Sequence, residues 1–246
     1  MSGPPPERLL EWVGRVGAVS AADVQLRFAI APRAARARLA ALGRAGLIAE
    51  RRLLHDVPPL YVATRTGLRH AGLSALGTCR VSAGGFQHWR ACARVAVFLE
   101  RRHPGRISSD RELRAIEREA GCRVASARLG VLDSGEAGSH HPDLVVWPGH
   151  PGGRPVAVEV ELTTKAPRRL EEICRAWTRA REVGAVVYYA PPPVEQALVR
   201  VVRALQAEDT VWIVPLEVVE RELARREESA RGAQCRSPGR TVSSGA

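Results

Sequence analysis

Residues 140–165 have the sequence HHPDLVVWPGHPGGRPVAVEVELTTK, and this stretch decides how the second half of the chain folds. Apolar residues predict two strands, at 142–147 and 155–162, joined by a turn rich in Pro, Gly and His. Asp143 stands at the start of the first strand. Glu159 and Glu161 lie two apart in the second, so both project from the same face of the sheet. Pairing of the strands as a hairpin would bring three carboxylates to one site.

These carboxylates interrupt strands that are otherwise hydrophobic, and a charge on a partly buried face costs free energy unless something binds it. Hard divalent cations use carboxylate oxygens together with water and substrate phosphates. We therefore predict that Asp143, Glu159 and Glu161 hold Mg²⁺ or Mn²⁺ and act in metal-assisted phosphodiester cleavage. The alternatives are a solvated sheet edge, or a site that keeps its geometry without turnover.

Lys165 is the single lysine of the chain, because the other 36 of its 37 basic residues are arginine. It follows the second strand closely enough to turn back toward the carboxylates. A compact ammonium group suits the orientation of a water or contact with a scissile phosphate, so Lys165 is predicted as a further catalytic residue. The alternative is an ordinary surface lysine.

Helices and strands alternate on both sides of residues 140–165. Amphipathic patterns predict helices at 87–102, 110–119, 167–182, 193–206 and 216–226, and further strands at 122–132, 185–189 and 210–214. Ser109 and Glu112 form a capping box at the start of the second of these helices. The pattern predicts an α/β domain over residues 86–228, followed by a polar, disordered tail at 229–246.

The first part of the chain has a different order. Three helices are predicted at 6–16, 21–28 and 32–44, followed by extended runs at 47–53 and 60–64 with prolines between them. Three helices and a hairpin are the order of a winged helix-turn-helix, which we place at residues 6–75. The sequence LAALGRAGLIAERR (39–52), followed by LYVATRTGLRHAG (60–72), also resembles that family.

The α/β part resembles the PD-(D/E)XK phosphodiesterase superfamily, with its αβββαβ core. Pro142-Asp143 stands for the PD, and Glu159-Val160-Glu161 stands where (D/E)-x-K is expected, so Glu161 replaces the usual lysine and Lys165 is its displaced counterpart. Together, the two parts are similar to the plasmid replication-relaxation proteins. That resemblance implies DNA binding and Mg²⁺-dependent nicking in the replication or mobilisation of an element. The alternative is an inactive DNA-binding regulator or replication accessory protein that keeps the nuclease fold.

The net charge of +11, with a pI near 10.7, also indicates a polyanionic partner. Residues 1–80 carry 12 basic and 5 acidic residues, so the excess is concentrated in the predicted winged helix-turn-helix. We expect double-stranded DNA to contact the third helix and the wing through Arg33, Arg36, Arg38, Arg44, Arg51 and Arg52. The alternative is a solvated arginine-rich face.

Other classes of function are disfavoured by the sequence. No stretch has 18 consecutive apolar residues and the N-terminus lacks a signal-peptide pattern, so we expect a cytoplasmic protein without a membrane partner. Five scattered cysteines without CxxC spacing argue against disulfides and structural zinc. His140, His141 and His150 are interpreted as loop residues and His88 as structural, and homodimerisation is left open.

Overall fold

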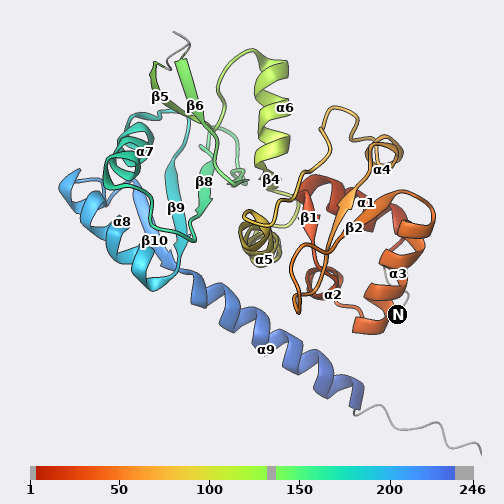
Figure 1. Ribbon diagram of the computed structural model, residues 1–246. Helices are drawn as coiled ribbons and strands as arrows, with labels where there is room; N and C mark the ends of the chain where they lie inside the picture. The colour runs from red at the N-terminus through yellow and green to blue at the C-terminus, as the bar shows by residue number, and fades with distance from the viewer. Residues whose placement is uncertain (1–3, 132–136, 236–246) are drawn as a thin grey trace, which may run out of the picture.

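The structure is a computed structural model that describes residues 4–131 and 137–235. These residues form a mixed α/β protein whose strands lie in three sheets (Figure 1). The mixed fold class expected from the sequence is therefore confirmed.

The first part of the chain folds into helices and a small antiparallel sheet of order β1-β3-β2. Prolines start the first and third helices, where the missing N–H is not needed. The second helix begins with a capping box, because Ser20 Oγ accepts from the Asp23 N–H while Asp23 accepts from the Ser20 N–H. The elements are α1 (Pro6–Val16), β1 (Ala18–Val19), α2 (Ala21–Phe28), α3 (Pro32–Arg44), β2 (Ile48–Arg51), β3 (Leu60–Ala63) and α4 (Arg65–His70).

Thr64 and Gly67 fix α4 against the start of β2. The Thr64 hydroxyl caps α4 by accepting from the Gly67 N–H at 3.0 Å and donates to the Gly46 carbonyl at 2.7 Å. A Cβ at Gly67 would lie 1.9 Å from the Leu47 carbonyl oxygen, so only glycine permits this approach. The Thr-x-x-Gly sequence at residues 64–67 is thus explained by the cap on α4 and by its close packing against Leu47.

The second part of the chain is built on a five-stranded sheet of order β10-β9-β8-β7-β4. Neighbours among β4, β7 and β8 are antiparallel, whereas β8, β9 and β10 run parallel. A separate two-stranded sheet pairs β5 with β6. The elements are α5 (Phe86–Arg102), β4 (Ile107–Ser109), α6 (Asp110–Ala120), β5 (Ala127–Val131), β6 (Ala137–His140), β7 (Leu144–Val146), β8 (Val156–Val160), α7 (Pro167–Arg179), β9 (Ala185–Ala190), α8 (Pro192–Ala204), β10 (Val211–Pro215) and α9 (Leu216–Cys235).

Alternation along β8 sends its side chains to two different layers. Val158 and Val160 belong to the hydrophobic cluster that includes α5, whereas Ala157 belongs to the cluster that includes α7. Glu159 lies between the two valines in sequence, opposite Tyr188 of β9, and therefore faces the α7 layer. The predicted strand pair is confirmed, with Leu144 opposite Val158.

Helix α5 joins the two parts of the chain through one hydrophobic cluster. Leu9 and Leu39 of the first part belong to the same cluster as Val95 of α5 and Val158 of β8. The predicted segments 6–75 and 86–228 thus share a core. In Figure 1, α5 lies between the helices of the first part and the five-stranded sheet.

Polar contacts cross the same junction. The Trp12 indole N–H donates to Glu100 Oε2 at 3.1 Å, and Arg27 forms an ion pair with the same carboxylate. Arg15 donates to Glu112 at 2.7 Å. Because Glu100 is buried, the two donors supply partners that its charge needs away from water.

The C-terminal helix is longer than predicted. The expected helix at 216–226 continues as α9 to Cys235, so part of the segment predicted as a disordered tail from residue 229 is helical. Ion pairs of Arg94 with Glu220 and of Arg102 with Glu222 attach the first half of α9 to α5. Residues 236–246 lie outside the described part of the chain.

We expect Glu100→Ala to lower the free energy of unfolding by about 2 kcal/mol, because it leaves Arg27 and Trp12 without their buried acceptor. This loss of stability is smaller than the usual cost of breaking a buried ion pair, because the Arg27 side chain is 33% exposed. Urea unfolding followed by circular dichroism measures it. Glu172→Ala, which removes a half-exposed ion pair with Arg169, is the control and should cost less than about 0.5 kcal/mol. Equal losses in the two variants would contradict the role of Glu100.

Candidate functional site

Asp143 lies directly before β7 and connects it to β8 and α5. Its Oδ2 accepts a hydrogen bond from the Val160 N–H at 2.7 Å, which fixes the carboxylate over the end of β8. Its Oδ1 lies 3.0 Å from His88 Nε2 on α5. The hydrogen bond to Asp143 raises the pKa of His88, against the opposing effect of burial.

Glu159 is buried beneath α7. Its Oε1 lies 2.6 Å from His140 Nε2 and accepts a hydrogen bond from the Trp177 indole N–H at 3.1 Å. Burial raises the pKa of Glu159, and the Asp143 charge acts in the same direction, while His140 and Lys165 oppose it. The carboxyl group is thus held in place by two side chains in a setting that disfavours its charge.

Lys165 turns back toward the carboxylates, as predicted, and forms an ion pair with the buried Glu161. Burial lowers the pKa of Lys165, while the charges of Glu159 and Asp143 act in the opposite direction. About a third of the Lys165 side chain stays exposed, so it remains accessible from solvent.

The three predicted carboxylates end at one edge of the sheet but point to different partners. Asp143 is held by Val160 and His88, Glu159 by His140 and Trp177, and Glu161 by Lys165. Within residues 4–131 and 137–235, the group whose possible ligand atoms all lie within 4.8 Å of one another is His88, Cys92 and Asp143. This group offers nitrogen and sulfur donors beside the Asp143 oxygen, whereas Mg²⁺ prefers oxygen ligands.

Two histidines that were not predicted as functional residues contact the carboxylates. His88 was interpreted as structural and His140 as a loop residue, yet they bond Asp143 and Glu159. His140 is the last residue of β6, opposite Ala127 of β5, rather than part of a loop. The four-residue spacing of His88 and Cys92 on a predicted helix was the available signal, since it places both on one helical face.

The neighbouring His141 is structural. It forms a 3.0 Å pair with Glu117, whose carboxylate also accepts the backbone N–H groups of Val124, Ala125 and Ser126. These bonds secure the segment that leads into β5, and so they support the strand pair that carries His140. His150 is exposed in the turn after β7.

Five of the six arginines predicted to contact DNA are exposed. Arg36 and Arg52 line a cavity of about 300 Å³ together with Tyr61 and the start of α2, so the third helix and the hairpin meet there. Arg38 differs, since it is half-buried and lines a cavity near Pro6 and His70. Its Nη1 is buried without a hydrogen-bond partner. The exposed five are Arg33, Arg36, Arg44, Arg51 and Arg52.

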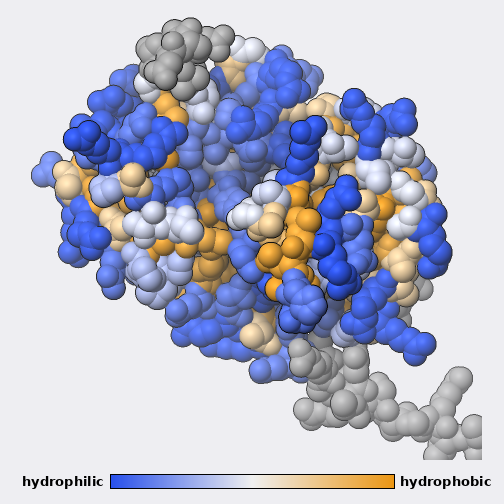
Figure 2. All heavy atoms as spheres, in the orientation of Figure 1, coloured by the Kyte–Doolittle hydropathy of each residue, from blue (hydrophilic) through white to orange (hydrophobic). Residues whose placement is uncertain are grey.

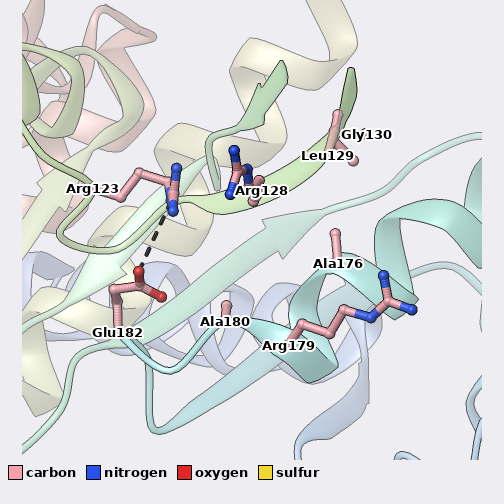
Figure 3. A pocket seen from close by; sticks show the side chains of 8 residues that line it. All are labelled: Arg123, Arg128, Leu129, Gly130, Ala176, Arg179, Ala180 and Glu182. Atoms are coloured by element: carbon pink, nitrogen blue, oxygen red, sulfur yellow. Dashed lines mark ion pairs between the residues drawn. The ribbon is translucent and has the colours of Figure 1, made fainter. Parts of the chain in front are cut away.

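A second basic pocket of about 340 Å³ lies between β5 and α7 (Figure 3). Arg123, Arg128 and Arg179 line it, with Glu182 as the acidic residue among the lining side chains. Arg123 is 3.9 Å from Glu182, so the pocket keeps an excess of positive charge. Arg128 lies opposite Ser139, directly before His140, which places the pocket beside the strand pair that holds Glu159.

No protein-family model, curated protein or solved structure matches this chain. Among the helices of the described residues, none combines the length and apolar character needed to cross a bilayer.

We expect Glu159→Gln to raise the free energy of unfolding at pH 7. The glutamine carbonyl can accept the same bonds from His140 and Trp177, while the cost of a buried charge disappears. Glu159→Ala is the comparison, because it leaves both donors unpaired and should destabilise by about 1–3 kcal/mol. Urea unfolding measures both variants. Equal destabilisation by Gln and Ala would show that the charge itself stabilises the fold.

Proposed function

We propose that the protein binds double-stranded DNA through its first part and cleaves phosphodiester bonds at the site of Asp143, Glu159 and Lys165. The observation that carries the proposal is that the single lysine of the sequence pairs with Glu161 directly after β8, the strand that carries Glu159 and whose Val160 N–H holds Asp143. We further propose that the chain is of the plasmid replication-relaxation type and acts in DNA replication or mobilisation.

The arrangement of α5, β4, β7, β8, α7 and β9 supports a PD-(D/E)XK-like fold. A helix precedes three antiparallel strands, and a helix then leads to a strand that runs parallel to the third. This is the αβββαβ order, with α6 and the β5–β6 pair inserted between its first and second strands. Asp143 and Glu159 occupy the positions that the resemblance assigns to the acidic motif residues.

The order of elements from α1 to β3, with its three-stranded sheet, supports a winged helix-turn-helix. Its exposed arginines are available to phosphates from both α3 and the β2–β3 hairpin. Hydrophilic residues cover most of the face seen in Figure 2. The pocket of Arg123, Arg128 and Arg179 offers a further phosphate contact near Glu159.

The residues of the site suit hydrolysis of a phosphodiester. The partly exposed Lys165 can contact a non-bridging phosphate oxygen and offset the charge that develops during attack by water. Asp143, fixed by Val160 and His88, can orient that water. His140 and Trp177 position the carboxylate of Glu159 and act through it.

A non-catalytic DNA-binding regulator is the second candidate. The observation that favours it is that each carboxylate already has partners within the protein: His88 and Val160, His140 and Trp177, and Lys165. In that case the same residues would stabilise the sheet edge without turnover. Measurement of DNA cleavage separates the two functions.

For DNA binding, we expect the double variant Arg33→Ala/Arg36→Ala to weaken duplex affinity about tenfold or more. It should also lower the slope of log K against log salt by about 2, because two phosphate contacts are lost. Fluorescence anisotropy over a salt series measures both quantities. Arg200→Ala/Arg203→Ala on α8 is the control with equal charge change, and equal weakening by both variants would contradict binding through α3.

For cleavage, we expect wild-type protein to convert supercoiled plasmid to the nicked form with a divalent cation. Lys165→Ala should reduce the nicking rate about 100-fold or more, and Asp143→Asn should reduce it similarly. Agarose gels with Mg²⁺, Mn²⁺, Zn²⁺ and Co²⁺ in separate series measure the rate. The exposed Asp209→Asn is the control and should keep the wild-type rate. Plasmid that is bound but uncut in every series would favour the regulator.

A further inference from the structure

We infer that His88, Cys92 and Asp143 form a three-ligand site for a borderline transition-metal ion of the Zn²⁺ or Co²⁺ class. The inference rests on the proposed function, because it names the cation of the same site. It concerns a mixed nitrogen, sulfur and oxygen donor set rather than the carboxylate oxygens expected from the sequence.

The donor atoms already lie close to the separations that such an ion requires. His88 Nε2 is 3.0 Å from Asp143 Oδ1 and 3.4 Å from Cys92 Sγ, and all three atoms lie within 4.8 Å of one another. Ligand atoms around a tetrahedral Zn²⁺ ion, bound at 2.0–2.3 Å, are roughly 3.5 Å apart. Small side-chain adjustments would therefore complete the coordination.

Helix geometry explains why two of the donors lie together. His88 and Cys92 are four residues apart on α5, so their side chains lie on one face of the helix. Asp143 approaches from the start of β7, and the Val160 N–H holds its second oxygen at 2.7 Å. That bond leaves Oδ1 directed to the other two donors and acts as an outer-sphere contact that orients a ligand.

One ring nitrogen has two polar neighbours in this group. His88 Nε2 lies within bonding distance of both the Asp143 carboxylate and the Cys92 thiol. A single ring nitrogen can either donate one proton or accept with one lone pair, so it cannot donate to Asp143 and accept from Cys92 at once. A cation between the three atoms takes a lone pair from each of them.

The chemistry of the donors selects the ion. Thiolate and imidazole suit Zn²⁺ and Co²⁺, whereas Mg²⁺ prefers oxygen ligands alone. Binding displaces the Cys92 thiol proton to solvent, since the thiolate is the ligand. Three protein ligands leave a fourth position for water or a phosphate oxygen, which is the arrangement of catalytic rather than structural zinc sites.

Access to that fourth position is open. The side chain of His88 is 42% exposed and that of Asp143 is 21% exposed, while Cys92 is buried at the inner end of the site. Asp143 belongs to the proposed cleavage site as well, and the Val160 N–H that holds it comes from the residue next to Glu159, so the ion would lie beside that site.

The test is titration of the full-length, chelator-treated protein with CoCl₂, followed by absorption spectroscopy. We expect one equivalent to give a near-ultraviolet band from thiolate-to-cobalt charge transfer, together with the intense visible bands of tetrahedral Co²⁺. Zn²⁺ should displace the ion. Cys92→Ser should remove the charge-transfer band. His88→Gln, at a partly exposed position, should lower the affinity about tenfold or more with the fold intact.

The exposed Cys122 supplies a matched control, because it is a free thiol that adventitious metal can reach from solvent. Cys122→Ser should keep the band. Loss of the band in Cys122→Ser, its survival in Cys92→Ser, or absence of Co²⁺ binding would overturn the assignment.

Plasmid nicking by the same samples separates this inference from the proposed function. Mg²⁺-supported nicking that Cys92→Ser leaves unchanged would refute the mixed-donor site and retain the phosphodiesterase. The expected cobalt spectrum with uncut plasmid would support the site and refute the phosphodiesterase.

Discussion

The burial of α5 between two groups of elements holds the two parts of the molecule together. One hydrophobic cluster includes residues of α1, α3, α5 and β8, so the helix contributes to both parts of the molecule at once. Near its C-terminal end, Glu100 needs Trp12 and Arg27 as partners for a buried charge. Near its N-terminal end, His88 and Cys92 meet Asp143. The position of α5 thereby determines both the junction and the candidate site.

In the candidate site, the strands fix the backbone positions and the helices fix the side-chain directions. Asp143 and Glu159 come from neighbouring antiparallel strands, which fix their backbones, but their side chains turn toward different helices. Burial makes a charge on Glu159 costly, and bonds from His140 and Trp177 to Oε1 hold the carboxyl group in place. An apolar residue at position 159 would avoid this cost, so the stability of the sheet alone does not explain a glutamate there.

Local sequence patterns predicted most helices and the longer strands, because their causes are local, whereas the short β1, β4 and α4 were not predicted. Pro6 and Pro32 start helices, Ser20 and Ser109 cap them, and alternating valines define β8. The β6 strand was missed because its sequence, Ala-Gly-Ser-His, has little strand preference and is held by pairing with β5.

The candidate site was predicted only in part. Asp143, Glu159 and Lys165 do come to one edge of the sheet, but the partners that turn the carboxylates apart are distant in sequence. His88 is 55 residues from Asp143, and Trp177 is 18 from Glu159. Such pairings depend on how α5 and α7 pack, which no local periodicity specifies. For the same reason, the local patterns of the sequence do not predict that the segments 6–75 and 86–228 contribute to one hydrophobic cluster.

The shared core restricts the motion of the two parts of the chain relative to each other. Two domains on a flexible linker could explore many relative positions, but units that bury one continuous cluster move together. In the proposed function, a duplex held by α3 would meet the β7–β8 edge at one fixed offset. The packing of α5 would then set the spacing along the duplex between the bound bases and the phosphate that reacts.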